Sequence, residues 1–478
     1  MSSSRIPQEE VGNVKQALTD IVGEENVSDA LFDKISYSKD TWSLRLMEFK
    51  RGIIKPFPDV IVWPENTLQV AEIVKVANEK TIPVIPYGGG AGVTGGTIPI
   101  HGGVIVDLKK LDKILEIDEK SATVTVQAGV IGQDLENALN KRGYTFPHQP
   151  ASMYCSSVGG FAACRSAGTF SSKYGRVEDM VVCLEAVLPT GEVIRTRKAP
   201  KSSTGPNLNQ IFIGSEGTLG IITELTFRIM PLPEERRFRG FILPSLHSGL
   251  EAVRKLYRKN VIPCLIRLYD ETDAMLVLGM VKIPRKHCFL ILTFEGNEDV
   301  VRAEEKAATQ ICQEEGGNDL GPEEAEKWFG KRYNMYYPNP VYARMHMLAD
   351  TIDVGATYDK LEDLYQNVKK AVEKSGRVQA MAHFSHFYTE GGSIYMIFVL
   401  TESDDIRAEE IYKKCWEEGM KAALDTGGTM SHHHSIGLLK GKFLKTELGS
   451  SYEVLVKLKK ALDPNNIMNP GKLGLDIT

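Results

Sequence analysis

Three consecutive histidines, His432, His433 and His434, lie near the C-terminal end of the sequence. An imidazole has an ordinary pKa of about 6.5, so it can take a proton from an alcohol or an activated carbon at neutral pH. In extended chain the first and third rings would point to one side and the second ring to the other. The triplet predicts an acid–base site or a metal-binding tract, and an exposed polar loop is the plain alternative.

A metal ion at the triplet would need further ligands from elsewhere in the chain. The nearest candidates are His383 and His386, which flank a Phe-Ser pair. Histidine clusters often ligate zinc, so a structural metal is an alternative to acid–base chemistry.

A first glycine-rich loop follows a predicted strand that ends at Pro86. It reads Tyr87-Gly88-Gly89-Gly90-Ala91-Gly92 and so places several bare backbone N–H groups on one short arc. Such an arc can close on a diphosphate and donate hydrogen bonds to its oxygens. The spacing fits neither the lysine-containing phosphate loop nor a Gly-x-Gly-x-x-Gly turn that opens a helix. Taken alone, the loop could also be a glycine-rich hairpin without a ligand.

Further segments of the same composition favour a ligand-binding loop over a hairpin without a ligand. Small residues fill Val158-Gly159-Gly160 and Ser166-Ala167-Gly168, and Gly214-Ser215-Glu216-Gly217-Thr218-Leu219-Gly220 repeats the composition later. Turns alone do not explain so many glycine-rich segments within one predicted domain. A cradle for a large, flat, phosphorylated cofactor explains all of them.

The elements around these glycine segments alternate between strand and helix. Hydrophobic patterning predicts strands at 59–63, 81–86, 104–108, 114–117, 123–128, 181–188 and 221–229, and helices at 67–79 and 131–141. Thr67 is the predicted N-cap of the helix at 67–79. Residues 8–50 form a helical lead-in, with Val14, Ala17, Leu18 and Ile21 at helical spacing.

The pattern changes at about Arg237. Strands at 238–243, 289–295 and 393–400 alternate with amphipathic helices at 249–259, 300–315 and 361–375. This order predicts an antiparallel sheet flanked by helices. We divide the chain into a lead-in (1–50), a cofactor domain (51–233), a substrate domain (234–430) and a C-terminal segment (431–478) that packs on the cofactor domain.

The composition is that of an ordinary soluble globular protein. The 478 residues are 42% hydrophobic and 25% charged, and the net charge of −5 comes without any basic block, which argues against nucleic-acid binding. No apolar run is long enough for a membrane helix, and the polar N-terminus is not a secretory signal. Seven cysteines without Cys-x-x-Cys pairs predict buried, reduced thiols and a cytoplasmic protein.

The glycine-rich segments resemble a known family. Residues 86–90, 156–160, 174–182 and 214–224 are similar to the FAD-binding domain of the vanillyl-alcohol oxidase superfamily, also called the p-cresol methylhydroxylase type. The resemblance implies an α+β fold, with an FAD-binding domain of two subdomains and a cap domain of antiparallel sheet and helices. It places the pyrophosphate at the first loop and the flavin and adenine along 216–222.

The cofactor residues that the resemblance implies run through the whole cofactor domain. No histidine lies between Tyr87 and Gly96, so we expect non-covalent FAD. The set is Pro86, Tyr87, Gly88, Gly89, Gly90, Ala91, Gly92, Thr94, His148, Ser152, Ser156, Ser157, Gly159, Gly160, Ser166, Gly168, Tyr174, Glu216, Gly217, Gly220, Ile221 and Ile222.

Two branches of the superfamily are similar to the rest of the chain. The D-lactate and glycolate dehydrogenase branch carries a Glu-His pair and a second metal histidine, but here His433 replaces that glutamate and 387–395 lack the histidine. We therefore expect no metal. The triplet and residues 392–395, 266–270 and 147–150 instead resemble alkyldihydroxyacetonephosphate synthase and its microbial relatives.

That second resemblance implies roles for single residues. His433 would be the main catalytic group, supported by His432 and His434, and Tyr395 would exchange a proton with the substrate. Arginine binds carboxylate or phosphate in a bidentate manner, so Arg267 and Arg344 would hold an anionic group, or Arg267 would lie over the flavin. His386 would also contact the substrate. Each of these residues could instead be structural. Both arginines could form ordinary ion pairs, Tyr395 could be a core residue, and His383 could have a structural role.

Three functions follow from these resemblances. The first is an oxidoreductase that passes a hydride from a small hydroxy acid or a phosphorylated polyol to flavin N5, and then electrons to a quinone, a carrier protein or oxygen. The second is a transferase of the alkyldihydroxyacetonephosphate synthase kind, without net redox change. The third is a non-catalytic FAD-binding subunit of an electron-transfer complex. We favour the first, and we expect a homodimer, with peripheral membrane contact left open.

Overall fold

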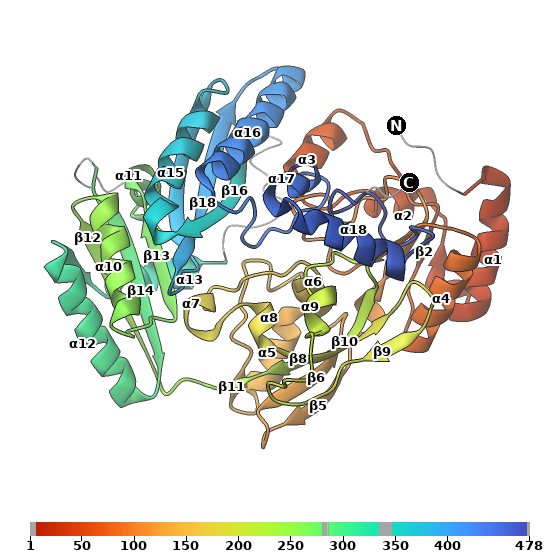
Figure 1. Cartoon of the computed structure of the whole chain (residues 1–478), viewed down its shortest axis with the longest axis horizontal. Helices are drawn as coiled ribbons and strands as arrows, with labels where there is room; N and C mark the ends of the chain where they lie inside the picture. The colour runs from red at the N-terminus through yellow and green to blue at the C-terminus, as the bar shows by residue number, and fades with distance from the viewer. Residues whose placement is uncertain (1–5, 280–283, 285, 334–346, 476–478) are drawn as a thin grey trace.

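The first part of the chain folds into two adjacent sheets (Figure 1). The computed structural model describes residues 6–279, 284, 286–333 and 347–475. Within these residues the first sheet has the order β1-β2-β4-β3 and the second the order β5-β6-β10-β8-β9. The predicted α+β class is confirmed.

The first sheet carries the first glycine loop. Strands β2 (Val60–Val62), β4 (Val104–Asp107) and β3 (Val84–Tyr87) run parallel, and α4 (Thr67–Glu79) supplies the crossover that parallel strands need. The predicted N-cap is wrong by one residue. The side chain of Asn66 accepts the N–H of Gln69, whereas the hydroxyl of Thr67 donates to Glu185.

The lead-in is helical, as predicted, with one interruption. Its helices are α1 (Val11–Val22), α2 (Leu31–Ser36) and α3 (Ser43–Lys50). Between the first two, β1 (Val27–Ser28) pairs with β2 in the antiparallel direction. A strand of two residues leaves too short a hydrophobic pattern to be predicted.

The second sheet is antiparallel throughout and agrees with the predicted strands and helix to within one residue at each end. Two further strands, β7 (Tyr144–Thr145) and β11 (Met230–Pro231), pair with each other. The sheet and its flanking helices are β5 (Ile114–Asp118), β6 (Thr123–Gln127), β10 (Ile221–Arg228), β8 (Val181–Val187), β9 (Val193–Arg195), α5 (Gly132–Asn140) and α6 (Val158–Ala163).

The substrate domain contains the predicted antiparallel sheet. Its strand order is β15-β12-β14-β13-β17-β18-β16, and we call it the seven-stranded sheet. Its strands are β12 (Glu235–Leu243), β13 (Leu265–Tyr269), β14 (Cys288–Gly296), β15 (Asn318–Gly321), β16 (Met347–Thr357), β17 (Val378–Ser385) and β18 (Gly391–Thr401). The helices packed on it include α10 (Leu246–Arg258), α12 (Glu298–Glu314), α15 (Tyr358–Glu373) and α16 (Asp405–Thr426).

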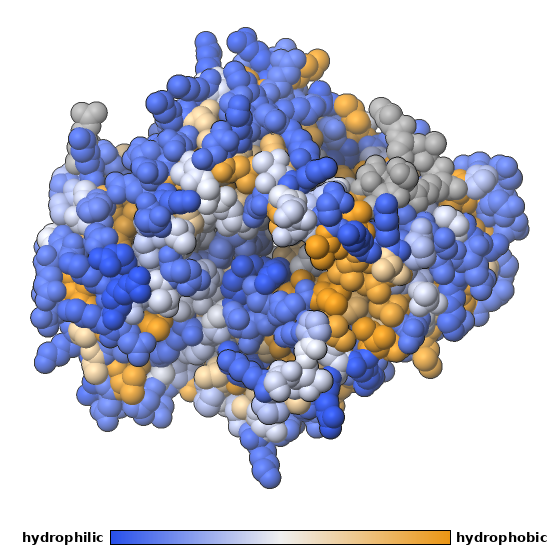
Figure 2. All heavy atoms as spheres, in the orientation of Figure 1, coloured by the Kyte–Doolittle hydropathy of each residue, from blue (hydrophilic) through white to orange (hydrophobic). Residues whose placement is uncertain are grey.

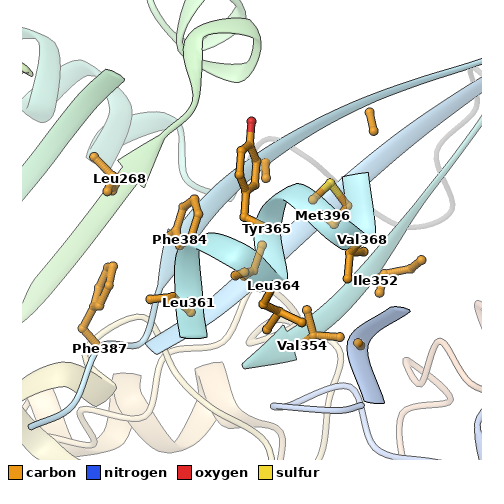
Figure 3. Close-up of a cluster of buried hydrophobic side chains, with 14 of the residues drawn as sticks. Leu268, Ile352, Val354, Leu361, Leu364, Tyr365, Val368, Phe384, Phe387 and Met396 are labelled. Atoms are coloured by element: carbon orange, nitrogen blue, oxygen red, sulfur yellow. The ribbon is translucent and has the colours of Figure 1, made fainter. Parts of the chain in front are cut away.

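One face of the seven-stranded sheet forms a hydrophobic core with α15. Figure 3 shows Leu364 and Val368 of this helix over Ile352, Val354 and Met396 of the strands. All five side chains are fully buried. Because side chains alternate along a strand, the residues between these apolar positions point to the opposite face.

The C-terminal segment returns to the cofactor domain. After α17 (Leu444–Leu448) and α18 (Ser451–Leu462), the N–H of Val84 in β3 donates to the carbonyl of Ile467 at 2.8 Å. The side chain of Lys459 is buried, pairs with Asp463, and donates to the carbonyl of Thr218 at 2.9 Å. The end of the chain is thereby joined to the first sheet and to the third glycine segment.

The surface is mostly hydrophilic (Figure 2) and is hollowed where the two domains meet. Hydrophobic residues gather in the region of α18, a helix on which Val454 is 67% exposed. The prediction that every cysteine is buried is wrong, because Cys155 is exposed and Cys164 and Cys183 are half-buried; all seven thiols are free. No helix among the described residues is long and apolar enough to cross a membrane.

Candidate active site

The first glycine loop contacts the second. A Cβ atom on Gly88 would overlap the hydroxyl of Ser157, and one on Gly89 would overlap the carbonyl of Cys155. The N–H groups of residues 89–92 make no hydrogen bond with any other described residue. Four consecutive free amides beside a second glycine-rich segment fit the diphosphate of a dinucleotide cofactor.

The second segment is packed as closely as the first. Ser157 caps α6 by accepting the N–H of Gly160 at 3.3 Å, and a Cβ on Gly159 would clash with Ala128. Ser152 lies one turn earlier, and its carbonyl accepts the N–H of Ser156 at 2.9 Å. Glycine is therefore required here for close packing as well as for access to a ligand.

The third glycine-rich segment, residues 214–220, and the two isoleucines after it lie partly in the hydrophobic core and partly at the site. Gly217 has a φ of +73° and lies against Pro86, while Gly220 lies against the carbonyl of Val187. The side chains of Ile221 and Ile222 belong to the hydrophobic cores on either side of β10, so only their backbone can face a cofactor.

Glu216 points away from the glycine loops, toward the C-terminal segment. Its carboxylate accepts the N–H of Ile436 at 2.7 Å and that of Gly437 at 2.9 Å. Burial raises the pKa of Glu216 to about 7, although these two amides and Lys472 oppose the shift. This residue, predicted as a cofactor contact, binds the segment that carries the triplet.

Another group of predicted cofactor residues surrounds His148. This histidine is fully buried, its Nε2 lies 2.8 Å from the hydroxyl of Ser166, and burial lowers its pKa to about 3. Gly168 packs against the backbone at the same place. Thr94 instead contacts the hydroxyl of Ser435 at 2.9 Å, and Tyr174 packs between two hydrophobic cores.

The open face of the seven-stranded sheet carries a row of polar residues. Tyr395 of β18 is paired with His383 of β17 on one side and with Asp353 of β16 on the other. Strand β13 lies next to β17 and contributes Arg267. All four positions alternate with residues of the α15 core, so their side chains share the face opposite that helix.

His383 holds Arg267 in place. Its Nδ1 lies 2.8 Å from a carboxylate oxygen of Asp273, and its Nε2 contacts the guanidinium. Because a guanidinium only donates, Nε2 accepts and Nδ1–H donates to Asp273. The guanidinium also lies 4.8 Å over the ring of Trp328, and its Nε has no partner among the described atoms. Arg344 lies outside the described residues.

The triplet forms a turn around one carboxylate. The N–H groups of His432, His433 and His434 all donate to the same oxygen of Asp353, at 3.0, 2.8 and 2.9 Å. The expectation that neighbouring rings point to opposite sides is wrong, because this backbone is a turn and not a strand. The rings of His433 and His434 lie 4.4 Å apart.

The rings of the triplet meet side chains of the seven-stranded sheet. His433 is stacked 5.9 Å from Tyr395 and lies 4.8 Å from His386, whose Nδ1 is 2.7 Å from the hydroxyl of Ser171. The Nε2 atom of His432 is 3.0 Å from the hydroxyl of Tyr388. The structure thus brings together the triplet, His386 and Tyr395.

These imidazoles are neutral at pH 7. Burial lowers the pKa of His432 to about 3 and holds the pKa values of His386 and His433 well below the ordinary value. Burial also lowers the pKa of His434, against the opposing charge of Asp353. Neutral rings can accept a proton from a bound substrate.

The spacing of three rings also bears on metal binding. One nitrogen each of His386, His432 and His433 lies within 4.8 Å of the others, which is close enough for a shared ion. However, the Nδ1 atoms of His432 and His433 are 3.0 Å apart, whereas two nitrogens on one tetrahedral zinc are roughly 3.3 Å apart. The separation fits an N–H···N hydrogen bond, so we assign these two rings as a hydrogen-bonded pair.

Several residues of the site were missed in the sequence. Asp353, Asp273 and Tyr388 bind residues named from the sequence, and Lys440 pairs with Asp353. Burial lowers the pKa of His148, His432 and His433, and the guanidinium of Arg176 adds to that shift. One signal was present: Asp353 is a lone acid between two apolar strand residues. For the others, sequence spacing gives no sign of the contact.

Replacing Gly89 by alanine tests the cradle. The new methyl group has no room beside the carbonyl of Cys155, so purified Gly89→Ala should lose the yellow flavin that the sequence predicts. Gly12→Ala is the control, because nothing lies within 4 Å of its added methyl group. Flavin content is measured by absorption after denaturation. Equal flavin in both variants would show that this loop does not bind the cofactor.

Replacing Glu216 by glutamine tests the burial of its carboxylate. A folded pKa of about 7, against an ordinary 4.5, means that its contribution to stability is present at acidic pH and is lost as pH rises through 7. Glu216→Gln should gain stability relative to the native protein between pH 5 and pH 8, by up to about 3 kcal/mol. Thermal unfolding at both pH values measures this. A difference that does not change with pH would contradict it.

Comparison with known proteins supports the same cofactor. Residues 58–197 match the FAD binding domain family, and residues 232–473 match the C-terminal domain of FAD linked oxidases. Over 471 residues the chain is 30% identical to alkyldihydroxyacetonephosphate synthase of Trypanosoma brucei brucei, which covers 91% of this chain and 75% of that protein. Over 472 residues it is 29% identical to glycolate oxidase subunit GlcD of Bacillus subtilis (strain 168), which covers 96% of each.

The fold agrees with a solved structure as well. Substrate-bound p-cresol methylhydroxylase superposes with a TM-score of 0.81 at 20% identity, over 99% of this chain and 98% of that one. The predicted superfamily, fold class and cofactor are confirmed. The chain belongs to the FAD-linked oxidase family, and its cofactor is FAD.

Proposed function

We propose that this protein is an FAD-linked oxidoreductase that oxidises the hydroxyl-bearing carbon of a small anionic substrate. The observation that carries the proposal is the group of imidazoles against Tyr395, on the face of the seven-stranded sheet that also carries Arg267. The substrate is a hydroxy acid of the D-lactate or glycolate type, or a phosphorylated polyol.

Arg267 binds the anionic group in this proposal. His383 takes one edge of the guanidinium, and Trp328 covers one of its faces, so the side chain is fixed before the substrate arrives. The Nε–H has no partner in the part of the chain that the structure describes and is left to donate. A guanidinium in a fixed position binds a carboxylate or phosphate with defined geometry, which orients the carbon that reacts.

His433 is the proposed base. Its Nδ1 is paired with His432, while its Nε2 makes no hydrogen bond with any described residue. If Nδ1–H of His433 donates to His432, and Nε2–H of His432 donates to the hydroxyl of Tyr388, then Nε2 of His433 has a free lone pair. Burial raises the pKa of Tyr395 to about 12, so this phenol stays protonated and can donate to the substrate oxygen.

The proposed reaction balances as follows. The hydroxyl proton moves to Nε2 of His433, and the hydrogen on the same carbon leaves with its electron pair, so the alcohol becomes a carbonyl. FAD, when bound, would supply the two-electron acceptor for that hydride, and a quinone, a carrier protein or oxygen would be the final acceptor. We propose that this FAD is held without a covalent bond.

The similarity to the glycolate oxidase subunit, which is 29% identical over 96% of each chain, supports the oxidoreductase.

The second candidate is the exchange of an acyl for an alkyl group on a dihydroxyacetone phosphate ester. The 30% identity to the trypanosomal synthase and the triplet that resembles the synthase branch favour it. Here too Arg267 would bind the phosphate and His433 would move the proton, but no net reduction of the flavin would remain.

Anaerobic mixing separates the two candidates. D-lactate, glycolate, D-2-hydroxyglutarate or glycerol 3-phosphate should bleach the visible flavin band if the hydride of the substrate remains on the cofactor. A long-chain alcohol with acyl-dihydroxyacetone phosphate is the parallel arm, followed by mass spectrometry of the lipid. A flavin that stays oxidised with all four compounds, together with formation of the alkyl product, would replace the oxidoreductase with the transferase.

The role of His433 is tested by His433→Ala. The variant should keep its flavin, because the glycine cradle is unchanged, but the rate of bleaching should fall by roughly 10²- to 10⁴-fold through loss of the base. His247→Ala on α10 is the control, since that side chain is 69% exposed and pairs with Glu362. Stopped-flow absorption gives both rates. A normal rate in His433→Ala would reject this assignment.

A further inference from the structure

We propose that Asp353 is a positioning residue, whose buried carboxylate fixes the turn that presents the histidine triplet to the substrate. The inference rests on the proposed function, in which His433 must meet a substrate held by Arg267. It adds a residue that touches neither substrate nor cofactor.

The first observation is the binding of three consecutive amides by one oxygen atom. In a strand, neighbouring N–H groups point to opposite sides, so no single acceptor can take all three. The oxygen of Asp353 accepts from His432, His433 and His434 within 3.0 Å, which forces the backbone into a turn. Hydrogen bonds to an ionised acceptor are about twice as strong as neutral ones.

The second observation is that the carboxylate stays charged. Its other oxygen pairs with Lys440, and both side chains are fully buried. Burial alone would raise the pKa of Asp353, but the ammonium group of Lys440 holds it well below the ordinary value. Lys440 also donates to the hydroxyl of Ser431 at 2.9 Å, so the ion pair binds the residue before the triplet as well.

The third observation is that Asp353 itself cannot shift. It is paired with Tyr395 in the register of β16 and β18, and both of its neighbours, Ile352 and Val354, are buried in the α15 core. The carboxylate therefore fixes the position of the triplet relative to the sheet. It sets the position of His433 relative to the face that carries Arg267.

A second carboxylate supports the other end of the same segment. Glu216 of the cofactor domain accepts the N–H groups of Ile436 and Gly437. Asp353 thus sets the segment relative to the seven-stranded sheet, and Glu216 sets it relative to the glycine segments. Of these two carboxylates, only that of Asp353 binds the turn at 432–434.

The test compares Asp353→Asn with a matched control on the same strand. Asp350 is half-buried and faces α16, where Tyr412 and Trp416 donate to it. With the substrate that bleaches the flavin, Asp353→Asn should lower kcat about 100-fold, because a displaced base loses its alignment. KM should change less than roughly threefold, since Arg267 is untouched. Asp350→Asn should keep kcat.

A second measurement needs no substrate. The ¹³Cε1–¹H NMR signals of the three histidines, assigned by single substitution in the holoenzyme, report the position of each ring. They should move in Asp353→Asn and stay in place in Asp350→Asn. This arm remains valid if none of the four compounds bleaches the flavin, so failure of the proposed function and failure of this inference can be told apart.

Asp353→Asn leaves Lys440 unpaired in the interior and can lower stability for that reason alone. The double variant Asp353→Asn/Lys440→Met removes both charges and should recover the midpoint of thermal unfolding, but neither kcat nor the native histidine signals. Recovery of kcat and of those signals would show that Asp353 only neutralises Lys440, which overturns the proposal. Unchanged histidine signals in the single variant would overturn it as well.

Discussion

Five backbone N–H groups of one short segment bind two buried carboxylates, and the geometry of the site depends on this interaction. Asp353 comes from the substrate domain and Glu216 from the cofactor domain. A carboxylate that binds backbone amides fixes the path of the chain and not merely one side chain. Both charges are removed from water, a cost that Lys440 offsets for Asp353 and that a raised pKa relieves for Glu216.

The same strands build both the core and the chemistry of the substrate domain. Along β16 and β18, apolar residues meet α15, and the residues between them carry the carboxylate and the phenol of the site. The two-residue period of a strand makes this division automatic. It also makes the site sensitive to register, because a slip of one residue would bury Asp353 against α15 and expose Ile352.

Local patterns predicted local structure well. Four of the five strands of the second sheet were predicted to within a residue, because alternation and flanking glycines are properties of neighbouring residues, whereas β9 was not predicted. Contacts between distant residues could not be predicted: Asp353 and the triplet are about 80 positions apart, and nothing in the spacing shows that they meet. The extended conformation expected for His432 to His434 was wrong for the same reason, since a distant carboxylate determines it.

Because the C-terminal segment returns to β3, the parts of the site are synthesised at different times. The glycine segments leave the ribosome early, and N-terminal domains generally fold first. The imidazoles emerge near the end, followed by the residues that bind Val84 and Thr218. A nascent chain therefore carries all three glycine segments before it carries the triplet.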